Sequence, residues 1–237
     1  MELAPGLRRI GNDLVAAYLV VDEAGITVID AGLGGHWNDL IRELKAIGRA
    51  PGDIRAVVLT HGDSDHVGFA ERLRRDHGVP VYVHEADAAR ARGEESTKPE
   101  WGRMRPGAIV QFLGYTIAKG GLRTTYLGSV QTVSDGQVLD APGSPRVISM
   151  PGHSPGSIAV HVPAVDAVFV GDALTTRNVL TGVRGPRPAP FTDDPARAIE
   201  SLERLRATGA KWVLPGHGAP WSGGVEAAVD AVVAARG

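Results

Sequence analysis

Two histidines and two aspartates fall within six consecutive positions of the segment VVLTHGDSDHVGF, at residues 57–69: His61, Asp63, Asp65 and His66. Imidazole and carboxylate groups at this density are typical ligands of zinc, iron and manganese. The chain has no cysteine, which excludes thiolate ligands, disulfides and a cysteine nucleophile. A metal site in this protein must therefore be built from histidine, aspartate or glutamate.

Three further segments share one design, in which an apolar stretch runs into a metal-binding residue type beside glycine. They contain His153 in MPGHSPGS, Asp172 in FVGDALT and His217 in LPGHG. Proteins with layered sheets and helices place their chemistry at strand ends, because the rigid sheet fixes those positions. Glycine beside such a residue permits a positive φ angle and a close approach of the backbone. The segments are therefore candidates for one shared site.

The elements that position these segments alternate between strands and helices. Short runs rich in valine and isoleucine predict strands, and apolar residues three and four positions apart predict helices. The predicted strands cover residues 14–22, 25–30, 54–60, 79–85, 146–150, 157–162, 166–171 and 211–215. The predicted helices cover residues 37–47, 68–77, 195–207 and 225–235. This alternation favours a layered α/β fold.

The length and composition are typical of one globular domain. The chain has 237 residues, 43% hydrophobic and 22% charged, and we expect residues 1–237 to form a single domain. A net charge of −2 provides no general attraction for nucleic acid or anionic lipid. The N-terminal segment lacks the apolar stretch of a secretion signal, and no apolar run approaches about 18 residues. We expect a cytoplasmic protein with a small-molecule substrate and neither a nucleic-acid nor a membrane partner.

Residues 91–128 differ in character from the rest of the chain and predict an inserted lid, helical around residues 108–115. They are rich in glycine, and basic residues in and beside them outnumber acidic ones. The basic residues are Arg90, Arg92, Lys98, Arg103, Arg105, Lys119 and Arg123, and the acidic residues are Glu94, Glu95 and Glu100. Such a cluster is usually a solvated face, but beside a metal site it would suit an anionic substrate. Residues 182–190, rich in proline and glycine, predict a loop.

The order and spacing of the metal-binding segments resemble the metallo-β-lactamase superfamily. Its pattern consists of HxHxDH, a later histidine after Pro-Gly, an aspartate in a Gly-Asp loop and a final Pro-Gly-His. The match extends from VIDAG, which begins at residue 28, to LPGHG. The resemblance implies a four-layer αβ/βα sandwich, in which two mixed β-sheets are flanked by helices.

The resemblance also implies a dinuclear metal site, with zinc as the favoured metal. One ion would be bound by His61, Asp63 and His153, and the second by Asp65, His66 and His217, with Asp172 bridging the two. A pair of such ions lowers the pKa of a shared water toward about 7 and polarises a carbonyl oxygen. Asp65 is the catalytic candidate, because its place within the cluster would let it orient the hydroxide and carry a proton.

Other polar residues have simpler interpretations. Asp30, in VIDAG, is similar to the superfamily's aspartate that accepts a hydrogen bond from a histidine ligand; a helix cap is the alternative. The histidines outside the pattern are expected at a helix start, a helix end, a strand end and a half-buried strand face; they are His36, His77, His84 and His161.

Asp63 departs from the superfamily pattern, which has histidine at this position. With two divalent ions and one hydroxide, the three aspartates bring the net charge of the site to zero, whereas histidine at position 63 would leave +1. A face of two imidazoles and one carboxylate also suits iron or manganese. Asp63 either binds the first metal, or is too short and leaves one ion on Asp65, His66, Asp172 and His217, or marks a degenerate, inactive site. We favour the first outcome.

Three functions are compatible with these residues. The first hypothesis is a metal-dependent hydrolase that attacks an ester, thioester, lactone or amide carbonyl with a bridging hydroxide. The second, suggested by Asp63, is a di-iron redox or oxygen-handling protein. The third is a non-catalytic binding protein built on a degenerate site. The sequence predicts neither the substrate nor the oligomeric state.

Overall fold

Two β-sheets form the centre of the structure, a computed structural model that describes residues 1–96 and 102–235. The first sheet has seven strands, in the order β1 (Glu2–Ala4), β2 (Leu7–Gly11), β3 (Ala16–Val21), β4 (Ile26–Ile29), β5 (Ile54–Val58), β6 (Val81–His84) and β7 (Gln131–Val133). Strands β1 to β4 are antiparallel, and β4 to β7 are parallel. Lys98 and Glu100 of the predicted lid lie outside the described residues.

The second sheet has four strands, in the order β13 (Trp212–Pro215), β10 (Ala167–Gly171), β9 (Ile158–Val162) and β8 (Arg146–Ser149). Strands β8, β9 and β10 are antiparallel, and β13 runs parallel to β10. A separate antiparallel pair consists of β11 (Thr175–Arg177) and β12 (Arg184–Arg187). Both large sheets are therefore mixed.

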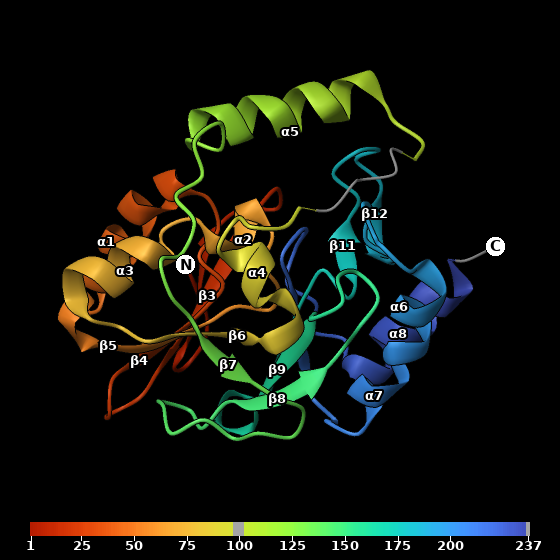
Figure 1. Ribbon diagram of the computed structural model, residues 1–237. Coiled ribbons are helices and arrows are strands. Elements are labelled where there is room, and N and C mark those ends of the chain that lie inside the picture. The colour runs from red at the N-terminus through yellow and green to blue at the C-terminus, as the bar shows by residue number, and fades with distance from the viewer. Residues whose placement is uncertain (97–101, 236–237) are drawn as a thin grey trace.

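Helices cover the outer faces of the two sheets (Figure 1). The helices are α1 (Trp37–Ala46), α2 (Ser64–Val67), α3 (Ala70–His77), α4 (Ala88–Ala91), α5 (Pro106–Ala118), α6 (Pro195–Ser201), α7 (Glu203–Arg206) and α8 (Val225–Ala234). Figure 1 shows α1 and α3 on one side of the molecule and α6, α7 and α8 on the other. Among the described helices, none is both long and apolar enough to cross a membrane.

The strand side chains divide the core into three apolar layers. Val57 belongs to the layer under α1 and α3, whereas the next residue, Val58, belongs to the layer between the sheets. Val168 packs with the layer under α6 to α8, while Phe169 points between the sheets and meets Tyr18 edge-on, with ring centroids 5.4 Å apart. This alternation follows from the two-residue period of a strand. The predicted four-layer αβ/βα sandwich is confirmed.

Most predicted elements are present, with boundaries shifted by a few residues. The predicted helix at residues 195–207 is divided into α6 and α7. The predicted loop at residues 182–190 is wrong in part, because β12 lies within it. Among the strands of the described residues, β12 pairs only with β11, so Pro186 lies in an edge strand, where proline is tolerated.

The predicted lid region contains α5, which is longer than the predicted helical turn and stands above the edge of the sandwich in Figure 1. None of its side chains is fully buried. Its C-terminal end is fixed to the body: the Gly35 amide donates to the Lys119 carbonyl at 2.8 Å, and Lys119 Nζ lies 2.6 Å from Asp39. His36 Nε2 also lies 2.7 Å from the Tyr115 hydroxyl. At the other end, the amide of Arg105 donates to the Leu180 carbonyl at 2.9 Å, and Arg177 donates to the Gln111 side chain at 2.6 Å. The helix is therefore held at both ends, over the segments described next.

Candidate metal centre

The four predicted segments meet at one edge of the two sheets. Strand β5 of the first sheet leads to His61, while β8, β10 and β13 of the second lead to His153, Asp172 and His217. Strands β10 and β13 are parallel neighbours, so their carboxyl ends lie side by side. The two-sheet sandwich thus brings residues more than 150 positions apart in sequence into one cluster.

Two glycines allow the backbone to approach this cluster closely, as the sequence pattern predicts. Gly171 has a φ of +50°, and a Cβ there would lie 2.2 Å from Thr60 Oγ1. A Cβ on Gly216 would lie 2.4 Å from His66 Cε1 and 2.7 Å from Asp172 Oδ1. Distances this short cannot be accommodated, so larger residues at either position would displace the cluster.

Asp63 lies with His61 and His153, the set predicted for the first metal. Its Oδ2 is 3.6 Å from His61 Nε2 and 3.4 Å from His153 Nε2. One potential ligand atom from each residue falls within 4.8 Å of the other two. The aspartate side chain is therefore long enough to complete this group of three.

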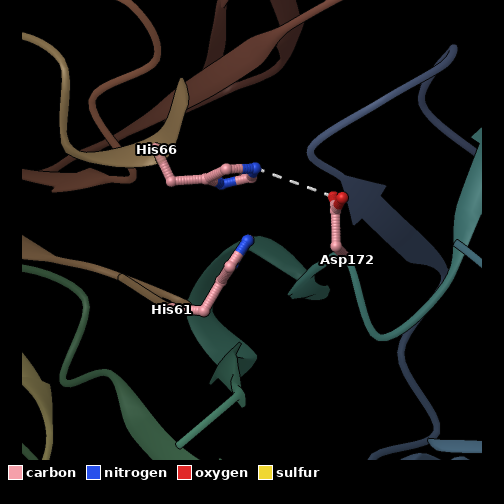
Figure 2. A group of neighbouring side chains, drawn as sticks. All are labelled: His61, His66 and Asp172. Carbon is pink, nitrogen blue, oxygen red and sulfur yellow. Dashed lines mark ion pairs between the residues drawn. The ribbon is translucent and has the colours of Figure 1, made fainter. Parts of the chain in front are cut away.

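The set predicted for the second metal is also assembled. Asp65 Oδ2 lies 3.4 Å from His217 Nε2, and His66 completes a group whose ligand atoms are within 4.8 Å of one another. Asp172 stands between the two sets. Its Oδ2 is 3.2 Å from His217 Nε2 and 3.9 Å from His153 Nε2. Its Oδ1 is 3.7 Å from His66 Nε2, and Figure 2 shows His61 and His66 facing the same space as Asp172.

Hydrogen bonds on the far side of two rings fix their orientation. His66 Nδ1 donates to Asp30 Oδ2 at 2.9 Å, which is the contact predicted for this aspartate. The Thr60 hydroxyl donates to Asp30 at 2.8 Å and accepts from His61 Nδ1 at 3.0 Å. Asp30 therefore supports both histidines, one directly and one through Thr60.

The other two rings are held in the same way. His153 Nδ1 donates to the Thr192 hydroxyl at 3.3 Å, and that hydroxyl donates to the Ala189 carbonyl. His217 Nδ1 donates to the Leu14 carbonyl. Because Nδ1 makes these hydrogen bonds in each ring, Nε2 of all four histidines is directed toward the cluster, where it can bind a metal once it carries no proton.

Replacing Asp30 with asparagine tests this support. The amide cannot accept from both His66 and the Thr60 backbone, so we expect metal affinity to fall by about 10- to 100-fold. Chelator competition on the purified variant measures the change. Asp166→Asn is the matched control, since Asp30 and Asp166 both have a positive φ, at 58° and 51°, which asparagine tolerates. An unchanged affinity in Asp30→Asn would contradict the role of Asp30.

Three buried atoms in the cluster have no hydrogen-bond partner among the described residues: His61 Nε2, His66 Nε2 and Asp172 Oδ1. A buried polar atom without a partner costs about 1–3 kcal/mol. Divalent metal ions would satisfy all three, since imidazole nitrogen and carboxylate oxygen are ligands of zinc, iron and manganese. The donor set therefore fits metal ions, and the structure brings together all seven predicted residues.

Charge interactions within the cluster are strong. Burial alone would lower the pKa of His66, but the carboxylates of Asp30, Asp65 and Asp172 outweigh it and raise that pKa to about 10. Burial likewise opposes the charge on His217, yet Asp172 and Asp65 raise its pKa to about 9. Burial keeps the pKa of His61 well below its ordinary value, and the neighbouring His66 reinforces this. The carboxylates thus attract positive charge, whether protons or metal ions.

These pKa values predict that metal binding strengthens as the pH rises. Without metal, His66 and His217 keep their protons at neutral pH, because their pKa values are raised to about 10 and about 9. An ion that binds both rings must displace both protons, so its affinity should rise up to about a hundredfold per pH unit below about pH 9. Chelator competition between about pH 6 and 8 measures this slope. A flat dependence would contradict the displacement of these two protons by the bound ion.

A cavity of about 330 Å³ opens above the cluster. Asp63, Asp65, Asp172, His153 and His217 line its floor. Its walls are largely apolar and include Leu33, Phe112, Val179 and Phe191. The ring of Phe112, from α5, meets His217 edge-on with centroids 6.1 Å apart. Helix α5 therefore forms part of the wall directly over the metal-binding groups.

The four histidines outside the pattern lie elsewhere. His36 is buried at the start of α1, His77 ends α3, His84 ends β6, and His161 is half-buried on β9. Of the predicted basic group, only Arg90 is among the described residues that line the cavity, and it forms ion pairs with Asp63 and Asp193. The sequence gives no sign of these two contacts, because they depend on the fold.

The structure also brings Asp87 to the site, a residue that the sequence pattern did not single out. This fully buried carboxylate accepts from the Gly62 amide at 2.9 Å, the Gly156 amide at 2.7 Å and the Ser154 hydroxyl at 2.7 Å. It thereby links the segment of His61 to the segment of His153. Asp87 comes just after the predicted strand at residues 79–85, which forms β6 and pairs with β5. A polar residue at the end of a strand was the signal that could have identified it.

Comparison with known proteins agrees with this geometry. The model of the metallo-beta-lactamase superfamily matches residues 10–217. The "probable metallo-hydrolase YflN" of Bacillus subtilis is 27% identical, with 94% of this chain and 87% of that protein covered.

Solved structures share the fold. The metallo-beta-lactamase family protein TTHA1429 from Thermus thermophilus superposes with a TM-score of 0.71 at 24% identity, covering 97% of this chain and 78% of that one. The crystal structure of TTHA1623 in a di-iron-bound form gives a TM-score of 0.63 at 29% identity. It covers 93% of this chain and 96% of that one. Because the family model matches residues 10–217, a range that includes all seven donor residues, the chain belongs to the metallo-beta-lactamase superfamily.

Proposed function

We propose that the protein is a hydrolase that binds two divalent metal ions and cleaves an ester, thioester, lactone or amide. The observation that carries this proposal is the pair of three-residue donor groups, joined by Asp172, beneath an open cavity. His61, Asp63 and His153 would bind one ion, and Asp65, His66 and His217 the other. We propose zinc as the physiological metal.

Two bound divalent ions would supply a hydroxide at neutral pH and a Lewis acid for the carbonyl oxygen. Asp65 is suited to hold and transfer a proton, because its side chain lies at the cavity floor and its Oδ2 is close to His217. The hydrogen bonds at each histidine Nδ1 keep the four rings in place during the reaction. Catalysis thus depends on Asp65 for proton transfer and on the buried carboxylates for charge balance.

The cavity favours an uncharged substrate with an apolar acyl group. Phe112, Val179 and Leu33 provide the apolar wall, and burial of such surface contributes about 25 cal/mol per Å². Arg90 is the one cation among the described lining residues, and two carboxylates already engage it. The observations on the described residues therefore support a neutral substrate over the anionic one that the basic lid suggested.

A di-iron redox or oxygen-handling function is the second candidate. It is favoured by Asp63 and by the likeness to TTHA1623, whose crystal structure is of a di-iron-bound form. The degenerate, non-catalytic alternative is less well supported, since every predicted donor residue lies in the cluster. The cytoplasmic location and the small-molecule substrate stay predictions from the sequence.

A reconstitution experiment tests these alternatives. The metal-free protein is loaded with zinc, manganese or iron, and each form is assayed on p-nitrophenyl esters, lactones, thioesters and amides. We expect hydrolysis that depends on added metal and is strongest on neutral, apolar substrates. A protein that binds two ions yet hydrolyses no member of the panel would contradict the hydrolase proposal. A coloured protein with about two iron ions per chain and no hydrolysis would favour the second candidate.

A further inference from the structure

Arg90, in α4, lies between two carboxylates at the edge of the metal cluster. Its Nη1 is 3.3 Å from Asp63 Oδ1, and its Nη2 is 2.8 Å from Asp193 Oδ2. Only 8% of the residue is exposed. The Asp193 amide in turn donates to the His153 carbonyl at 3.1 Å. The guanidinium is thus held in a fixed position beside the first donor group.

The two oxygens of Asp63 have separate partners. Oδ1 faces Arg90, whereas Oδ2 faces the Nε2 atoms of His61 and His153. Asp63 is also the N-cap residue of α2, but its side chain makes no capping hydrogen bond. Aspartate at an N-cap normally accepts from a backbone amide one turn into the helix. The carboxylate of Asp63 instead faces Arg90 on one side and the two histidines on the other.

Arg90 also offsets the charge that Asp63 adds. Aspartate in place of histidine lowers the net charge of the loaded site by one, and the adjacent guanidinium restores it. An arginine is suited to this role, because it keeps its charge and its planar group can contact two carboxylates at once. The pair of Asp63 and Arg90 by itself carries the same net charge as a neutral histidine, while Asp193 shares the guanidinium from its other side.

The segment that carries Arg90 is fixed to both loops of the first donor group. Asp87, three residues earlier, binds the loops of His61 and His153 through Gly62, Ser154 and Gly156. A Cβ on Gly62 would lie 2.7 Å from the amide nitrogen of Ala91, so this loop packs directly on α4. The position of Arg90 relative to Asp63 is therefore set by the fold and not by a mobile surface.

We propose that Arg90 is a positioning residue that makes Asp63 a ligand of the first metal through Oδ2 alone, and that offsets part of its charge. The proposal rests on the proposed function only in requiring two bound ions. It explains how a metallo-beta-lactamase fold accepts aspartate at this place. The side chain acts through Asp63 and is not assigned a contact with substrate.

The test is the affinity of each metal site in Arg90→Met, measured with zinc by chelator competition. We expect the first site to weaken by at least about tenfold and the second to stay within about twofold, because only Asp63 loses its support. With cobalt as the probe, the absorption spectrum of the first site should change. Arg92→Met is the matched control, since Arg92 follows α4 and pairs with the exposed Glu94. Arg90→Gln provides a second variant should the methionine variant fold poorly.

A double-substitution cycle separates this role from a general effect on folding. In an Asp63→His chain there is no carboxylate at position 63 to hold, so adding Arg90→Met should change the first-site affinity by less than about threefold. Equal affinities in the parent and Arg90→Met, or a loss of the same size in the Asp63→His background, would overturn the proposal. So would a parent chain that binds fewer than two ions. Failure to hydrolyse the substrate panel with both ions bound would count against the proposed function alone.

Discussion

Replacing Asp172 with asparagine is expected to reduce the metal content from two ions per chain to less than one and to lower kcat/KM by at least about a thousandfold. The reason is its central position, with oxygens 3.2 Å from His217, 3.7 Å from His66 and 3.9 Å from His153. Asparagine keeps the size of the side chain but offers one neutral oxygen in place of two charged ones. Elemental analysis gives the metal content, and steady-state kinetics on the best substrate gives the rate.

The control for this prediction lies at the other end of the same strand. Asp166 precedes β10, as Asp172 follows it, and its carboxylate accepts from the Lys211 amide far from the cluster. Asp166→Asn should keep both ions and nearly full activity. If Asp172→Asn retained two tightly bound ions, Asp172 would not bridge them, and the arrangement of the two sites would have to be revised.

Replacing Asp65 with asparagine is expected to lower kcat by about 10²- to 10⁴-fold while most of the metal remains bound. The amide oxygen can still face the second site, near His217, but the side chain can no longer accept a proton. The other donors of that site, His66 and His217, keep their orientation, because their hydrogen bonds through Nδ1 do not involve Asp65. The loss should therefore fall on turnover more than on metal content.

Comparison of metal content and rate distinguishes this outcome from simple loss of metal. Asp65→Asn should contain more than one ion per chain although its kcat is strongly reduced. Asp76→Asn, which changes an exposed carboxylate paired with Arg75 on α3, should behave as the parent. A loss of less than about tenfold in kcat with both ions present would remove Asp65 from the proton-transfer step.

The fold was predictable because apolar periodicity dominates its central elements. Strand β5 and helix α1 lie close to their predicted positions, since each buries the apolar residues that define its pattern. Strand β2 was missed because its segment LRRIG contains two arginines. Arg9 is nevertheless buried, and its Nη2 donates to the Gly218 carbonyl at 2.7 Å. That partner lies 209 positions away, so only the folded chain reveals why the strand tolerates the charge.

The cluster itself was predictable because each donor residue follows a strand and stands beside a recognisable neighbour. Its surroundings were not. Arg90 reaches Asp63 across 27 positions and Asp193 across 103, and neither spacing belongs to a local pattern. The sequence therefore presented Asp63 as an isolated departure, whereas the structure shows an aspartate held by an arginine. The sequence also could not show which residues of the basic group face the site, and of the described ones only Arg90 lines the cavity.

The most direct test is the metal content of the purified protein at saturation, measured by elemental analysis after removal of loosely bound ions. We expect two divalent ions per chain, falling to about one in Asp63→Ala while the second site stays occupied. A parent chain that binds a single ion, or an Asp63→Ala chain that still binds two, would contradict the claim that His61, Asp63 and His153 form a metal site.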